Sequence, residues 1–138
     1  MAATVPAVCS AERWSYNTLN QSPCVVGSAL KAVCQPGASP IVYLPPGYVY
    51  DGPSLVDRQN TPCRCSSVYY SLLSACAWCQ GRDFISWSRY ATNCTTAYLG
   101  VFPRELPRGT GVPAWAYMNV TVHHGFLGPC RSPGAQRP

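Results

Sequence analysis

Nine cysteines in a chain of 138 residues constrain this sequence more than any other feature. That density is unusual in a reducing compartment and usual in a small secreted domain held together by disulfides. Cys130 stands apart, because it lies in a proline- and glycine-rich C-terminal stretch. The other eight are an even number, and we expect all of them to be paired: Cys9, Cys24, Cys34, Cys63, Cys65, Cys76, Cys79 and Cys94.

The rest of the composition predicts a turn-rich domain of low charge. Its 14 prolines and 11 glycines favour long irregular loops, and 47% hydrophobic residues are enough to form a core. The net charge of +5 is spread over scattered arginines without a basic cluster, so we expect no nucleic-acid partner. The sequence has no run of about 18 apolar residues, so we expect no transmembrane segment in this chain.

Three segments have the apolar spacing and end signals of helices. Residues 22–34 begin with Ser22 as a candidate N-cap and Pro23 in the first helical position. Residues 66–79 begin with a serine and carry one apolar stripe, which predicts one buried helix face. A shorter helix is expected over residues 84–94. The expected fold is therefore mainly α, a small disulfide-rich domain with long Pro/Gly-rich loops.

The segments between and after these helices are expected to be irregular. Residues 36–62 are rich in proline, which limits strand pairing, so extended coil pinned by the flanking cysteines is the preferred interpretation. Residues 116–122 alternate weakly and allow a terminal strand.

The helical spacing limits the disulfide pairing without deciding it. Cys76 and Cys79 are three residues apart on one helix face, and such neighbours rarely bond to each other. We expect each to reach a different element, such as the Cys63-x-Cys65 arm, the first helix or Cys94. A zinc site on the two cysteine pairs is the main alternative, although a CxC pair is tighter than the usual zinc knuckle. A redox CxxC is a third interpretation, but that motif normally opens a helix and this one closes one.

Three sequons support export from the cell. They are Asn20-Gln-Ser, Asn93-Cys-Thr and Asn119-Val-Thr, and Asn119 is the strongest candidate because Asn20 is followed by Pro23 and Asn93 precedes a bridged cysteine. An exported glycoprotein is therefore the expectation from two independent features.

Few residues suggest chemistry. The sequence has no G-x-S-x-G elbow, P-loop or G-x-G-x-x-G motif, and its five acidic residues show no suggestive spacing. We expect no catalysis, no metal and no cofactor. Trp87 and Trp115 are candidates for stacking on a sugar ring, against the simpler interpretation that they pack in the core.

The two ends divide the chain into three parts. Residues 1–8 lack the early positive charge and unbroken apolar stretch of a secretory signal, so we expect that the signal is missing or truncated. Residues 9–124 form the expected cysteine-rich extracellular domain. Residues 125–138 read GFLGPCRSPGAQRP and have the composition of a disordered tail.

The motif strings resemble one protein family. They are WSYNTLNQSPC at residues 14–24, LPPGYVYDGP at 44–53, CRCSSVYYSLLSACAWCQG at 63–81, SWS at 86–88, NC at 93–94 and VPAWAY at 112–117. Together they resemble the ectodomain of uncharacterised mushroom-type (basidiomycete) fungal membrane proteins, with the cysteine- and serine-rich core at 63–81 the most specific part.

The resemblance implies an extracellular domain in which the eight cysteines are paired. In that family the domain follows a signal peptide and precedes a Ser/Thr-rich stalk, one membrane-spanning helix and a cytoplasmic tail. The present chain departs from that pattern at both ends. The family brings no known activity, so the expected role is recognition or structure at the cell surface, with a cell-wall glycan or another surface protein as partner. A carbohydrate-binding module, a secreted enzyme and a zinc-binding domain are the alternatives.

Overall fold

The computed structural model describes residues 5–56 and 58–121. Its elements are, in chain order, η1 (Arg13–Ser15), α1 (Pro23–Cys34), α2 (Ser67–Cys79), α3 (Trp87–Tyr90), η2 (Ala91–Asn93) and η3 (Ala114–Tyr117). Within the described residues, β pairing is limited to isolated bridges between Pro6 and Val42 and between Ser66 and Tyr98. The expectation of a small, disulfide-rich, mainly helical domain is confirmed. No helix in this part of the chain is long and apolar enough to cross a membrane.

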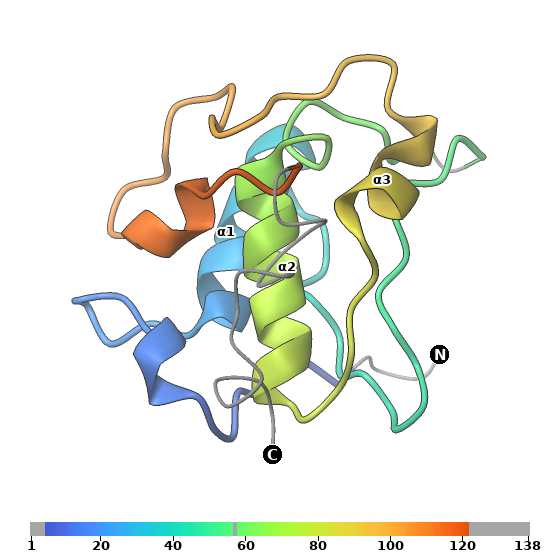
Figure 1. Cartoon of the computed structure of the whole chain (residues 1–138). Helices are drawn as coiled ribbons and strands as arrows, with labels where there is room; N and C mark the ends of the chain where they lie inside the picture. The colour runs from blue at the N-terminus through green and yellow to red at the C-terminus, as the bar shows by residue number, and fades with distance from the viewer. Residues whose placement is uncertain (1–4, 57, 122–138) are drawn as a thin grey trace.

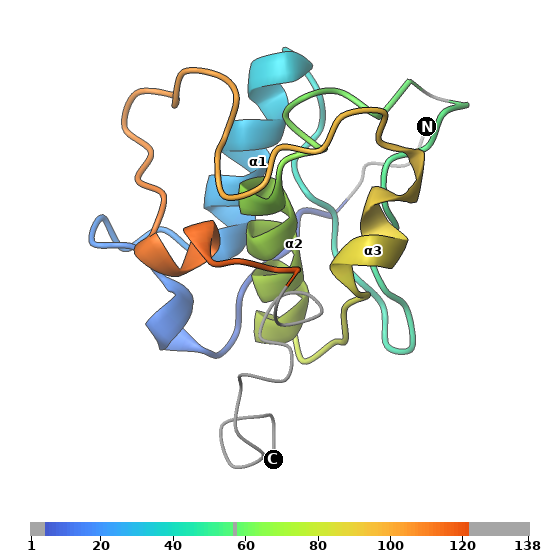
Figure 2. The ribbon, with the colours of Figure 1, turned by 45° about the horizontal axis from the view of Figure 1, so that its top comes forward.

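Helix α2 runs through the middle of the molecule, with α1 beside it and the loops around both (Figure 1; Figure 2). Every residue of α2 is buried, so the expectation of a single buried stripe is wrong. The reason is that small side chains, among them Ser67, Ser71 and Ser74, let neighbours pack on all sides of the helix. Gly27 in α1 serves the same close packing, because a Cβ there would lie 2.9 Å from Ile41 Cδ1 and 3.5 Å from Leu72 Cβ.

Serine caps start the α-helices where the sequence places serine. The Ser22 hydroxyl accepts a hydrogen bond from Val25 N at 3.2 Å, and Pro23 occupies the first turn, as predicted. The Ser66 hydroxyl accepts from Val68 N at 3.0 Å and so confirms the predicted start of α2. The predicted start of the third helix at residue 84 is wrong. Ser86 is the N-cap of α3, so the helix begins at Trp87 and residues 84–85 lie outside it.

The segment at residues 116–122 forms no strand in its described part. It contains the end of η3, which follows Pro113, a residue whose φ of −68° starts the short helix. The described residues of the segment 36–62 contain several turns and the bridge at Val42, and no helix. The expected tail at residues 125–138 lies outside the described residues.

Four disulfides join α2 and its N-terminal arm to the rest of the chain. The pairs are Cys9–Cys79, Cys24–Cys76, Cys34–Cys63 and Cys65–Cys94. Each pair has one member in the segment from residue 63 to residue 79, so every bridge is anchored on α2 or on the arm before it. Cys76 reaches the first helix, one of the expected partners, whereas Cys79 reaches Cys9, which helical spacing does not indicate.

Candidate functional site

A cavity of about 300 Å³ opens between α1, the loop of residues 39–59 and the start of α2. Lys31 and Arg64 bring two positive charges to its wall, and we call it the cationic cavity. Tyr50, Pro40 and Val42 add accessible ring and apolar surface, over the buried Tyr69 and Leu73. The combination of a small concave volume, apolar walls and a few charged groups is typical of a small-molecule site.

The Cys34–Cys63 disulfide holds the two cations at one place. Lys31 lies three residues before Cys34 on α1, and Arg64 directly follows Cys63. The bridged residues have Cα atoms 5.9 Å apart, and Cys63 N donates to Cys34 Sγ at 3.3 Å. Burial, and then the charge of Arg64, lower the pKa of the Lys31 amine. The covalent link therefore keeps together two like charges that repel each other.

Arg64 has a fixed backbone and one buried side-chain donor. Its N–H donates to Thr61 Oγ1 at 3.3 Å, and its carbonyl accepts a hydrogen bond of 2.7 Å from the Tyr90 hydroxyl. Its Nε is buried and has no hydrogen-bond partner among the described residues. An atom without accessible surface is out of reach of a ligand in the cavity, so a ligand would contact the guanidinium through its other nitrogens.

The tyrosines of the cavity stay neutral at physiological pH. Burial raises the pKa of Tyr69 to about 12. Burial also raises the pKa of Tyr50, whose hydroxyl donates to Val42 O at 2.5 Å and accepts from Gln80 Nε2 at 2.9 Å. Neither phenol supplies a negative charge that would neutralise the two cations.

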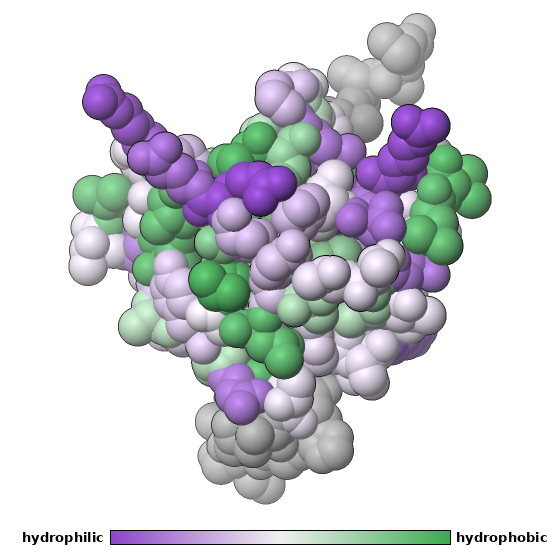
Figure 3. Space-filling view, turned by 90° about the horizontal axis from the view of Figure 1, so that it is seen from above, coloured by the Kyte–Doolittle hydropathy of each residue, from purple (hydrophilic) through white to green (hydrophobic). Residues whose placement is uncertain are grey.

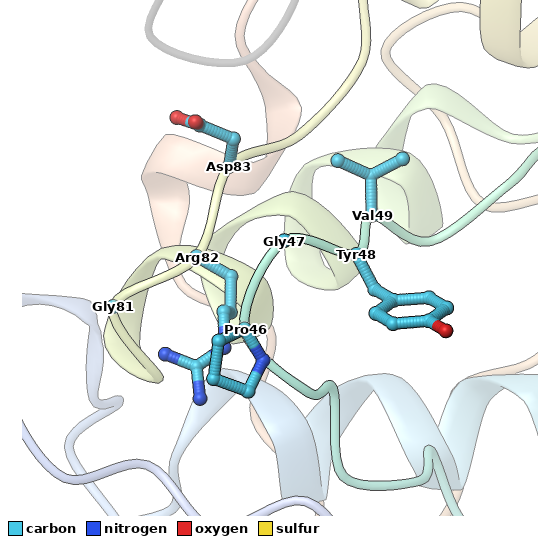
Figure 4. Close-up of a pocket in the computed structure, with 7 residues that line it drawn as sticks. All are labelled: Pro46, Gly47, Tyr48, Val49, Gly81, Arg82 and Asp83. Atoms are coloured by element: carbon cyan, nitrogen blue, oxygen red, sulfur yellow. The ribbon is translucent and has the colours of Figure 1, made fainter.

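A second hollow of about 180 Å³ lies between the Pro46–Gly47 turn and the end of α2 (Figure 4). Arg82 in its wall donates from Nε to Leu44 O at 2.8 Å and from Nη1 to Gln80 O at 2.9 Å. The guanidinium thus ties the loop to the end of α2. Figure 4 shows the side chains of Arg82 and Asp83 directed to opposite sides, so the charged groups here do not converge on a ligand.

The two tryptophans proposed for sugar stacking lie in different environments. Trp87 is 7% exposed and packs on Tyr70 and Tyr90, so it belongs to the core and has almost no surface to offer a sugar. Trp115 is partly buried and makes an edge contact with Trp14, at 5.5 Å between ring centroids. Trp14 is 46% exposed and was not indicated by the sequence pattern.

The three sequon asparagines are exposed. Asn119 Oδ1 accepts from the hydroxyl of Thr121 at 2.6 Å. Asn20 Oδ1 accepts from Arg13 Nη2 at 2.7 Å, and Asn93 Nδ2 donates to Pro53 O at 3.0 Å. Of the three, the Asn93 Nδ2, the atom to which a glycan would be attached, is held by the carbonyl of Pro53.

The zinc-binding and redox interpretations both need free thiols, and the eight cysteines in question are paired in disulfides. Zinc coordination needs thiolates, and the sulfur atoms of Cys63, Cys65, Cys76 and Cys79 are each bonded to a cysteine elsewhere in the chain. Among residues 5–56 and 58–121 no group of three or more His, Cys, Asp or Glu is placed to hold a metal ion.

Comparison of the chain with protein families, with curated proteins and with solved structures finds no match. What the protein does is therefore inferred from its own residues and their geometry. Among the residues that line the cationic cavity, Lys31 and Arg64 were not indicated by any functional motif in the sequence. The sequence places each of them within three residues of a cysteine, and only the structure shows that these two cysteines are bonded to each other.

Proposed function

We propose that this chain is an extracellular or cell-surface domain that recognises a ligand on a disulfide framework. The observation that carries the proposal is the complete pairing of eight cysteines in four bridges between distant segments. Such frameworks form and persist in oxidising compartments. The resemblance of residues 63–81 to the fungal ectodomain family and the exposed sequons at Asn20, Asn93 and Asn119 support the same conclusion.

The recognition role is supported by the shape of the surface. On the face shown in Figure 3, apolar residues form separate groups between polar ones, without the broad apolar area of a large protein interface. The cationic cavity is instead of the size and composition that a small ligand requires. A cell-wall glycan suits this geometry better than a second surface protein.

Thiol counting tests the framework. Protein made in an oxidising host is denatured, alkylated without reduction and weighed by mass spectrometry. We expect no more than one alkyl group, on Cys130, and nine after reduction, because the chain has nine cysteines of which eight are bridged. Eight alkylated thiols in the unreduced protein would contradict the proposal.

Secretion gives a second test of the same framework. Cys76→Ala and Cys79→Ala each break a bridge to a segment more than 50 residues away, so each variant should be retained by the secretory pathway. Cys130→Ala is the matched control and should be secreted like the unaltered chain. Normal secretion and melting of both bridge variants would count against the framework.

The Trp14–Trp115 pair favours a second candidate function, stacking on a neutral glycan. Its support is the exposed Trp14 ring in edge contact with Trp115. Titration with chitin and glucan oligomers should then shift the tryptophan fluorescence, and Trp14→Ala should abolish the shift. An unchanged spectrum across the panel removes this candidate.

A further inference from the structure

We propose that the cationic cavity binds an acidic sugar, a ring of monosaccharide size that carries a carboxylate, sulfate or phosphate group between Lys31 and Arg64. The inference rests on the proposed function, since it takes this cavity as the recognition site. It adds the chemical class of the ligand and the two residues that select it.

The charge balance of the cavity favours an anion. Lys31 and Arg64 both line it. Asp51 is the carboxylate among the lining residues, and its side chain is exposed to solvent. Two cations and one carboxylate leave the lining with a net positive charge, and the charge of Arg64 acts on the Lys31 amine. An anion between the two cations would relieve their repulsion and accept charge-assisted hydrogen bonds from the amine and the guanidinium.

The framework maintains this unfavourable arrangement. Cys34 and Cys63 join the two segments one helical turn from Lys31 and next to Arg64. Gly52 lets its loop approach α3 closely, since an added Cβ would lie only 2.0 Å from Tyr90 O. A fold selected for stability alone gains nothing from two adjacent positive charges. Preorganised charge that costs stability is typical of a binding site.

The size and walls of the cavity favour a sugar over a bare inorganic anion. A volume of about 300 Å³ is at the small end for organic ligands and far exceeds the need of a phosphate or sulfate ion. Pro40, Val42 and the ring of Tyr50 provide accessible apolar surface, while Gln59 and the Tyr50 hydroxyl are polar groups. A sugar ring matches this mixture, because it has apolar C–H faces and hydroxyl edges.

Calorimetric titration of the full disulfide-bonded chain tests the ligand class. The probes are glucuronate, glucose 6-phosphate, glucose and inorganic phosphate. We expect both acidic sugars to bind. Glucose and phosphate should bind at least about tenfold more weakly, because glucose lacks the negative charge and phosphate lacks the sugar ring. Glucose binding as tightly as glucuronate, or phosphate as tightly as glucose 6-phosphate, would overturn the proposal.

Substitution of the cations tests the site. Lys31→Gln should weaken glucuronate binding at least about tenfold. Arg64→Lys keeps the charge but removes the planar guanidinium with its paired donors, and should also weaken binding. Arg104→Gln is the matched control, since this exposed arginine donates to its neighbouring carbonyl and lies outside the cavity. Equal affinity of the Lys31→Gln and Arg104→Gln variants would place the ligand elsewhere and overturn the proposal.

A charge reversal separates binding from folding. Lys31→Glu replaces the repulsion at Arg64 with an attraction, so we expect the melting temperature to rise while binding of glucuronate is lost. A variant that keeps its affinity, or that loses affinity together with melting temperature, contradicts the proposal. The proposed extracellular framework is judged separately by thiol counting: four intact bridges without sugar binding overturn only the present inference.

Discussion

Gly52 is the residue at which the backbone leaves the least room. A Cβ built there would lie 2.0 Å from Tyr90 O and 2.8 Å from Tyr90 C, so the loop would have to move away from α3. We expect Gly52→Ala to lower the free energy of unfolding by about 3 kcal/mol. Urea unfolding measures it.

The matched control for Gly52 is Gly109. Its φ of +75° disfavours alanine, but nothing lies within 4 Å of its Cβ position, so Gly109→Ala should cost only about 1 kcal/mol. Equal losses for the two variants would mean that the close approach at Tyr90 does not exist.

Tyr69 gives a residue-scale prediction about pH. Its pKa rises from 10.0 in water to about 12 in the fold, because the phenol is buried. The folded state therefore holds its proton more tightly than the unfolded chain. The contribution of this group to the free energy of unfolding is fully present below pH 10. It falls by about 1.4 kcal/mol for each pH unit as the pH rises from 10 toward 12.

Urea unfolding at pH 9, 10 and 11 measures this slope. Tyr69→Phe removes the titrating group, so the variant should lose less stability than the unaltered chain between pH 10 and pH 11. Identical slopes for the two proteins would show that Tyr69 ionises as readily in the fold as in water.

At the scale of elements, the serine caps of α1 and α2 differ in the number of hydrogen bonds that each hydroxyl makes. The Ser22 hydroxyl accepts one backbone N–H, whereas the fully buried Ser66 hydroxyl accepts from Val68 N and also donates to Val101 O at 2.7 Å. Ser66→Ala leaves the buried Val68 N–H and the Val101 carbonyl without this partner and should cost about 2 kcal/mol, against about 1 kcal/mol for Ser22→Ala. Urea midpoints compare them, and a larger loss at Ser22 would contradict the expected order.

The starts of α1 and α2 were predictable because the cap signal is local. A serine before a proline favours a helix start where a helical apolar pattern follows, as it does after Ser22, and not where that pattern is missing, as after Ser39. The burial of α2 on every side was not predictable, since it depends on what packs against Ser71 and Ser74 from distant segments. The same limit applies to the pair Cys9–Cys79, which joins residues 70 positions apart and follows no helical spacing.

The sequence did not predict the cationic cavity either, because the cavity also depends on contacts between distant segments. Three separate segments contribute Lys31, Tyr50 and Arg64. These residues line one cavity only because a disulfide and a loop bring the segments together. Scattered arginines indicate ordinary solubility when taken singly. The aromatic pattern was misleading at Trp87, because spacing alone does not show which ring the neighbouring tyrosines cover.

At the scale of the whole molecule, the disulfides carry much of the stability. Closing a loop of 29 residues restricts the unfolded chain by about 3.6 kcal/mol, and closing one of 70 residues by about 4.4 kcal/mol. A domain of this size is stable by only about 5–15 kcal/mol in total. Loss of one bridge should therefore leave a weakened fold, and loss of two should leave none.

Paired Cys→Ser substitutions test this additivity. The variant lacking Cys9–Cys79 should unfold cooperatively at a lower urea midpoint and still bind glucuronate, because that bridge lies at the end of α2 away from Arg64. The variant lacking Cys34–Cys63 should lose no more stability, since its loop spans 29 residues against 70, but should also lose binding, because Lys31 and Arg64 are then free to separate. Near-UV circular dichroism reports folding and calorimetry reports binding. Equal affinities in these two variants would show that the bridge does not position the cations, and a cooperative transition after removal of both pairs would show that side-chain burial alone holds the fold.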